Sequence, residues 1–163
     1  MMEATELVMT CITALQSGDI DMAAQYLADD FVLRGWTEQT IDKSQFLAMQ
    51  SNLLAAMPDF SYNLSDVYSA GQGVEALIQV RGTNLGDLDL TMLDIAPIQA
   101  TGLTVELPQV PARFVTESDT VKEMAIETVA GGGLSGLLQQ IGGELPVEPR
   151  LDGQEVLDRR YEP

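Results

Sequence analysis

The chain has 163 residues, of which 45% are hydrophobic, and a formal net charge of −17 from 8 basic and 25 acidic side chains. This length is typical of one domain and buries roughly two-thirds of the surface that the unfolded chain exposes, so a core needs neither disulfide nor metal. The negative charge disfavours nucleic acids and anionic membranes as partners. With a single cysteine and neither a signal-peptide pattern nor a membrane-length apolar run, we expect the protein in a reducing cytoplasm.

Histidine does not occur in the sequence. This excludes Ser-His-Asp and Cys-His nucleophile pairs, a histidine general base and histidine metal sites. The absence of histidine therefore excludes most of the familiar catalytic chemistry for this chain.

Three helices are expected in the first third of the chain. The first covers about residues 3–16, where one stripe at helical spacing contains Leu7, Val8, Cys11, Ile12 and Leu15. Within it the Cys11 thiol should pack as a small hydrophobe. A short second helix should bury Ala23, Ala24 and Leu27. The third begins at Asp42, forms a capping box with Gln45 and stops at Pro58; its apolar face should hold Phe46, Leu47, Leu53, Leu54 and Met57.

Strands dominate the rest of the chain, and we expect them over residues 31–34, 60–70, 74–84, 103–117 and 120–129. The turns Gly71-Gln72-Gly73 and Glu117-Ser118-Asp119 are short, so the strands that they join must be antiparallel. Pro108 and Pro111 should lie at a bulge or a sheet edge. Residues 84–104 form either a loop or a short edge element.

A short terminal helix over residues 134–141 follows a glycine-rich connection. Helices first and antiparallel strands afterwards are typical of an α+β fold. We expect N-terminal helices packed on a strongly curved antiparallel sheet that encloses a pocket, a common place for small molecules. Residues 1–143 should form this domain and residues 144–163 a C-terminal tail.

Four segments, in order, resemble the SnoaL-like polyketide cyclases, whose fold is nuclear transport factor 2-like. They are Met57-Pro58-Asp59-Phe60-Ser61, Val80-Arg81-Gly82-Thr83-Asn84, Glu123 on the last strand, and Gly136-Leu137-Leu138-Gln139-Gln140-Ile141-Gly142. The similarity covers about residues 4–143. It implies a cone of helices capped by a curved sheet, and a homodimer that pairs through the sheet. It also implies an aldol closure without metal or organic cofactor, in which a last-strand acid transfers protons.

The resemblance selects the candidate site. Where the family reads Glu-His-Trp-Asp, this chain has Glu123-Met124-Ala125-Ile126, so Glu127, one residue on, is the candidate acid-base group. A one-residue step in a strand reverses the face, and a solvated glutamate is the alternative. Asn84 replaces the histidine of a Gly-Thr-His motif and could donate a hydrogen bond. Arg81 could bind a substrate carboxylate or enolate, or pair with a nearby acid.

The candidate pocket walls are six large apolar residues, which could equally be plain core: Trp36, Phe46, Met49, Met57, Phe60 and Met124. Three hypotheses for function stay open. The chain could be a cofactor-free cyclase, isomerase or hydratase acting on a small apolar substrate. It could be a non-catalytic pocket for a small apolar molecule, or a dimeric interaction module that has lost the family's catalytic residues.

Overall fold

The computed structural model describes residues 2–142, so the predicted tail at 144–163 lies outside the described residues. The helices are α1 (Ala4–Ser17), α2 (Ile20–Tyr26), α3 (Lys43–Ala56) and α4 (Gly133–Ile141), with a short 3-10 turn, η1 (Thr91–Leu93). Within the described part of the chain, no helix has both the length and the apolarity that a bilayer crossing requires.

The predicted helices α1 and α3 are confirmed. The predicted stripe of α1 is buried, and the helix ends at Gly18, whose φ of 85° is a left-handed conformation that glycine adopts without strain. At the start of α3, the Gln45 amide donates to Asp42 Oδ1 (2.8 Å) and the Asp42 amide donates to Gln45 Oε1 (3.1 Å). This is the capping box that the sequence predicts.

Six strands form the main sheet, in the order β2-β1-β8-β7-β4-β3. Their bounds are β1 (Leu27–Arg34), β2 (Ile41–Asp42), β3 (Ser65–Ala70), β4 (Gly73–Ile78), β7 (Val110–Glu117) and β8 (Thr120–Ile126). A separate pair joins β5 (Arg81–Thr83) to β6 (Thr104–Glu106). Both predicted hairpins are confirmed, since β3 pairs with β4 and β7 with β8, each antiparallel.

The all-antiparallel sheet predicted from the sequence is wrong in one respect, because β1 runs parallel to β8. Parallel neighbours need a long connection, and here it comprises every element from β2 to β7. Leu27 was expected in the second helix but begins β1, which is longer than the predicted strand. The sheet is therefore mixed, with its first and last strands side by side.

Three predicted strands are each interrupted, and the strand expected over residues 103–117 divides into β6 and β7, which lie in different sheets. Residues 60–70 are regular only from Ser65, after Asn63 with a φ of 46°, and residues 74–84 divide into β4 and β5, which lie in different sheets. Pro111 lies in the central strand β7 rather than at an edge. Its carbonyl accepts from the amide of Glu127, just past the end of β8. The backbone N–H that proline lacks would point the same way, toward the place where the pairing between β7 and β8 ends.

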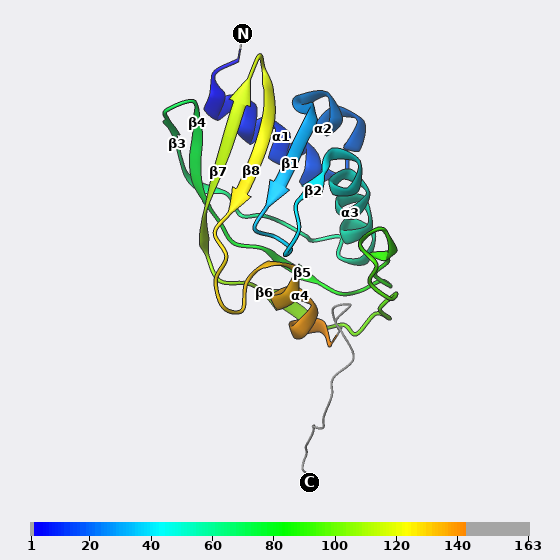
Figure 1. The fold of residues 1–163 in the computed structure, drawn as a ribbon. Coiled ribbons are helices and arrows are strands. Elements are labelled where there is room, and N and C mark those ends of the chain that lie inside the picture. Colours follow the sequence, from blue (N-terminus) through cyan, green and yellow to red (C-terminus); the bar gives the residue numbers. More distant parts are fainter. Residues whose placement is uncertain (1, 143–163) are drawn as a thin grey trace.

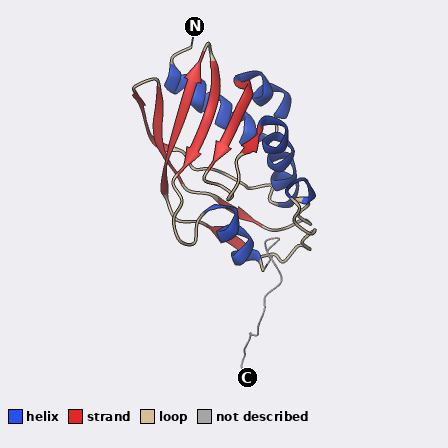
Figure 2. Ribbon diagram, viewed as in Figure 1, coloured by secondary structure: helices blue, strands red, loops and turns tan. Residues whose placement is uncertain are grey.

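Helices α1 to α3 lie on one face of the main sheet, and α4 lies with β5 and β6 beyond its lower end (Figures 1 and 2). The core between sheet and helices continues into this lower region, where Leu88, Leu90, Val105, Leu107, Leu134 and Leu137 are buried. The family-implied arrangement of helices on a curved sheet is thus present, with the interior lying between the two layers.

Candidate functional site

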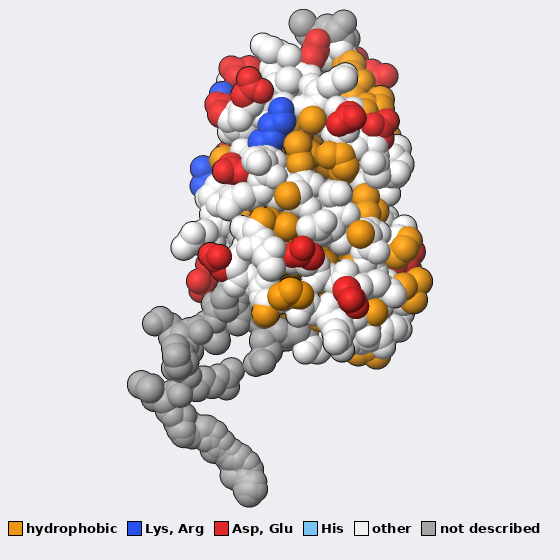
Figure 3. All heavy atoms as spheres, turned by 90° about the vertical axis from the view of Figure 1, so that its right-hand side faces the viewer, with side chains coloured by type: hydrophobic (Ala, Val, Ile, Leu, Met, Phe, Trp, Pro, Cys, Tyr) orange, Lys and Arg blue, Asp and Glu red, His pale blue; other side chains and the backbone are white. Residues whose placement is uncertain are grey.

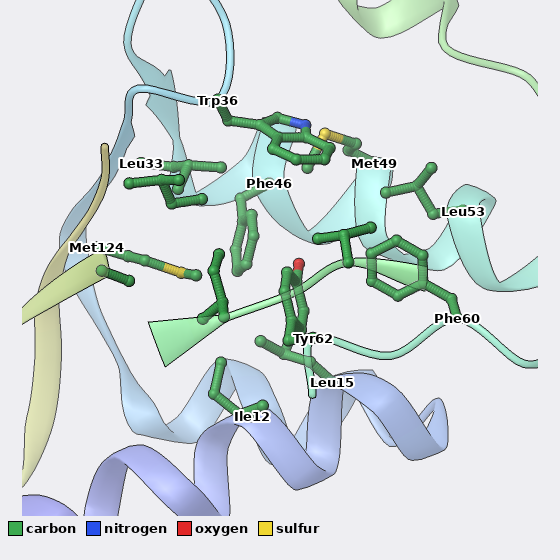
Figure 4. Packing of buried hydrophobic residues seen from close by; sticks show 14 of the residues in the cluster. Ile12, Leu15, Leu33, Trp36, Phe46, Met49, Leu53, Phe60, Tyr62 and Met124 are labelled. Atoms are coloured by element: carbon green, nitrogen blue, oxygen red, sulfur yellow. The ribbon is translucent and has the colours of Figure 1, made fainter. Parts of the chain in front are cut away.

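The interior between the sheet and α1 and α3 contains all six predicted wall residues, and each of them is buried. Figure 4 shows five of these side chains beside one another with Tyr62, Leu53, Ile12 and Leu15. Phe31 and Phe46 add a tilted ring contact with centroids 5.1 Å apart. The interior cavity measures only about 10 Å³ and is lined by Val8, Cys11, Ile12, Leu15, Leu27, Phe31, Phe46, Phe114, Val121 and Met124. In this conformation the walls fill the space that the sequence analysis assigned to a pocket.

A buried polar pair, which the sequence analysis missed, crosses this interior. The Tyr62 hydroxyl donates to Gln50 Oε1 at 2.6 Å, and Gln50 Nε2 donates to the Leu15 carbonyl at 3.3 Å. Gln50 lies four residues after Phe46, so its place on the buried face of α3 was readable from helical spacing. Its partner is twelve residues away, in the segment between α3 and β3, and no local pattern indicates this pairing.

Burial also shifts the two ionisable groups of the interior. It raises the pKa of the Cys11 thiol from 9.0 to about 12. Burial, followed by the nearby Cys11 thiol, raises the pKa of the Tyr62 hydroxyl well above its ordinary value. Both groups are therefore neutral at physiological pH and act as neutral polar atoms.

Trp36 closes one side of the interior. Its side chain is only 3% exposed, and its indole Nε1 is a buried polar atom without a hydrogen-bond partner. The residue follows Gly35, whose φ is 87° and which has no room for a Cβ beside the Ile126 carbonyl at the end of β8. The Trp36 carbonyl accepts from the amide of Leu134 in the first turn of α4 (2.9 Å). Sheet and helix thus fix the tryptophan from two sides.

Glu127, the predicted acid-base residue, is exposed and lies one residue beyond β8. Ile126, which stands where the resemblance places the family acid, is the residue that is buried. Glu123 is on the outer face of the sheet, where its Oε1 lies 3.5 Å from Arg34 Nε. The structure therefore brings neither glutamate to the interior.

Asn84 is completely buried, and its polar groups bind the chain itself. Its Nδ2 donates to the Gly86 carbonyl (2.9 Å), while its Oδ1 accepts from the amide of Thr101 (2.9 Å) and from the Thr101 hydroxyl (3.0 Å). These bonds join both ends of the 84–104 segment, which contains η1. Asn84 has its hydrogen bonds within this joint, away from Glu127 and the interior pair.

Arg81 is exposed on β5, where it lies close enough to Asp59 to help lower the pKa of that carboxyl. The larger cause is a clamp: Asp59 accepts from the Thr83 amide (2.7 Å) and from the Thr83 hydroxyl (2.9 Å). Two of the four segments that resemble the family thus meet each other. Gly82 lies against the Met57 side chain, where a Cβ would come within 3.0 Å of its sulfur.

Replacing Asp59 is expected to weaken this joint in a pH-dependent way. Asp59→Ala should lower the urea midpoint of unfolding at neutral pH, and Asp59→Asn, which keeps one acceptor, should lower it less. Because the folded-state pKa of Asp59 is below the ordinary 3.8, its contribution is present above that value and lost as pH falls through the folded pKa. The midpoints of wild type and Asp59→Asn should therefore converge between pH 5 and pH 2. A constant difference across that range would contradict the clamp.

Residues 8–124 match the SnoaL-like domain family. The chain belongs to this family. No curated protein matches the sequence. Within residues 2–142 of this SnoaL-like chain, no group of three or more histidine, cysteine or acidic side chains is placed to hold a metal ion.

Solved structures similar to this SnoaL-like chain share its fold at low sequence identity. A candidate polyketide cyclase from Pseudomonas putida KT2440 is 20% identical with a TM-score of 0.63, over 86% of this chain and 99% of that one. A candidate SnoaL-like polyketide cyclase from Jannaschia sp. CCS1 is 16% identical with a TM-score of 0.64, over 86% and 92%. A Catenulispora acidiphila protein with a ketosteroid isomerase-like fold is 14% identical with a TM-score of 0.62, over 88% and 98%. The nuclear transport factor 2-like fold expected from the resemblance is confirmed.

Proposed function

We propose that this SnoaL-like protein is a non-catalytic binder that encloses a small, neutral, apolar molecule between its sheet and helices. The observation that carries the proposal is the chemistry of the interior. Among the described residues, Gln50 and Asn84 are the buried residues of polar type, so no carboxylate lies inside to transfer a proton. The family-type enzyme requires such an acid, and Glu127 is exposed.

The interior has features that a binding site would use. Its hydrogen-bonding side chains are the neutral groups of Tyr62, Gln50 and Trp36, which suit a molecule without charge. Methionines contribute three of its walls, and their unbranched, flexible side chains can rearrange around a guest. The cavity of about 10 Å³ has room for about one water, so binding requires these walls to move apart.

Surface charge favours the same class of ligand. Acidic side chains outnumber basic ones on the face shown in Figure 3, in keeping with the net charge of −17. Four of the five cations between residues 2 and 142 form ion pairs with acids: Arg34, Lys43, Arg113 and Lys122. Anionic molecules would be repelled by such a surface.

Saturable binding is the expected result of the first test. Trp36 is the only tryptophan, so its fluorescence reports on the interior without mutation. Titration with neutral bicyclic compounds, 1-indanone and 1-tetralone, should shift its emission with a hyperbolic dependence and raise the melting temperature. Glu127→Gln should bind them with unchanged affinity because the glutamate is exposed. Absence of saturation with both compounds would overturn the binding proposal.

A second candidate, the dimeric interaction module, is favoured by the small size of the cavity. The face of the main sheet opposite the helices carries half-buried apolar side chains on neighbouring strands, including Val32, Leu77, Val115 and Ala125. Helices α1 to α3 all lie on the other face (Figure 1). We propose that two copies of the chain pair through this surface, whether the protein binds a small molecule or serves as an interaction module. Sedimentation should detect a dimer that Val115→Arg dissociates, and a wild-type monomer would contradict the pairing.

A further inference from the structure

The indole N–H of Trp36 is a buried hydrogen-bond donor of the interior that has no acceptor. Buried donors in folded proteins are almost always paired, and a buried donor without a partner destabilises the folded state. Among residues 2–142, Trp36 Nε1 is the buried side-chain nitrogen or oxygen that has no partner. A phenylalanine would fill similar space without this cost, so the donor calls for an explanation.

The neighbours of the indole do not supply an acceptor. In Figure 4 the nitrogen edge of Trp36 is turned toward Met49, whose thioether sulfur is a weak acceptor and makes no hydrogen bond with it. The buried polar pair of the interior makes no hydrogen bond with the indole either: the Tyr62 hydroxyl donates to Gln50, and Trp36 Nε1 has no partner. The residues that line the interior cavity do not include Trp36.

The position of Trp36 is fixed while its neighbours can move. The Gly35 contact with β8 and the Leu134 hydrogen bond hold its backbone on both sides. Met49 and Met57, both buried, are side chains with three rotatable bonds each. A guest that displaces these methionines would therefore meet a donor held in place, with little rearrangement of the tryptophan.

We propose that the molecule held in the interior carries a hydrogen-bond acceptor, a carbonyl or ether oxygen, that binds Trp36 Nε1. This rests on the binding function proposed above and specifies its ligand class: a compact, neutral, apolar skeleton with one acceptor oxygen. The acceptor oxygen gives the indole N–H its hydrogen-bond partner. A hydrocarbon of the same shape has no such oxygen and should therefore bind with lower affinity. Charged acceptors such as carboxylates are disfavoured, because the interior holds no cation among the described residues.

The test uses two matched pairs of probes, 1-indanone with indane and 1-tetralone with tetralin, on the wild-type chain labelled with nitrogen-15. The single tryptophan gives one indole N–H cross-peak, which should move downfield with each ketone and not with the hydrocarbons. Calorimetry should show that the ketone-over-hydrocarbon preference in affinity is about tenfold larger in wild type than in Trp36→Phe, which keeps an aromatic ring and removes the donor.

The outcomes separate this inference from the binding function. If hydrocarbons and ketones bind equally and neither moves the indole peak, the Trp36 acceptor is refuted while interior binding stands. If none of the four probes binds, both fall. A cross-peak between the indole proton and a bound water in the unliganded protein would also overturn the inference. The wild-type peak decides the question even if Trp36→Phe fails to fold.

Discussion

Replacing Tyr62 by phenylalanine is expected to lower the free energy of unfolding by about 1–3 kcal/mol. The hydroxyl donates to Gln50 Oε1 at 2.6 Å, and both residues are buried. Phenylalanine keeps the ring and its edge contact with Phe60, but it leaves the amide oxygen of Gln50 without a donor in an apolar surrounding. Urea unfolding followed by Trp36 fluorescence measures the loss, with an unchanged dependence on denaturant concentration.

The matched control removes both partners of this pair. Gln50→Leu alone orphans the Tyr62 hydroxyl and should also be destabilising, whereas Tyr62→Phe combined with Gln50→Leu should lose less than the sum of the single changes. Additive effects would show that the two side chains do not interact in solution. A Tyr62→Phe variant as stable as wild type would mean that the amide finds water, and hence that the interior is open to solvent.

Local signals in the sequence predicted the fold where one element determines its own ends. Asp42 and Gln45 supply both hydrogen bonds of a capping box within four residues, and the structure contains both. The predicted turn at Ser118 and Asp119 is confirmed for a similar reason, since both residues adopt positive φ and join the adjacent strands β7 and β8. Such features depend on neighbours in sequence and need no knowledge of the tertiary arrangement.

Pairing between distant strands was not predictable in this way. The alternation of buried and less buried side chains from Val74 to Val80 continues past the end of β4, because both Ile78 and Val80 are buried. The strands β4 and β5 nevertheless belong to different sheets. A period of two shows which face is buried and not which strand lies alongside. The parallel contact of β1 with β8 joins residues some ninety positions apart, and no turn marks it.

The burial of the six large apolar residues was predictable from the sequence, whereas the polar groups beside them were not. Large apolar residues such as Phe46 and Met124 go inside for reasons that composition and spacing capture. Glu127 was chosen by alignment to a family position, yet one step along the strand decides between interior and solvent, and the buried residue is Ile126. Helical spacing places Gln50 inside, but its hydrogen bond with Tyr62 became visible only when the fold brought the two side chains together.

Because Cys11 and Tyr62 are buried as neutral groups, we expect the free energy of unfolding to fall at alkaline pH. Burial raises the pKa of the Cys11 thiol from 9.0 in its ordinary state to about 12, and it raises the pKa of Tyr62 above 10.0. A group whose pKa is raised by folding stabilises the folded state fully below its unfolded pKa, and that stabilisation is lost as pH rises toward the folded pKa. Each such group should reduce the free energy of unfolding by about 1.4 kcal/mol per pH unit in its window.

The two contributions can be separated by their onset. Cys11 begins to act near pH 9 and should account for about 2 kcal/mol of lost stability by pH 10.5, whereas Tyr62 begins near pH 10. Cys11→Ala should therefore have the flatter profile between pH 9 and 10, and Tyr62→Phe should differ in slope from wild type only above pH 10. Urea unfolding at half-unit steps measures both slopes. If the Cys11→Ala profile runs parallel to wild type up to pH 10.5, the thiol ionises in the folded chain, and the interior is wetter than a closed site for a neutral guest requires.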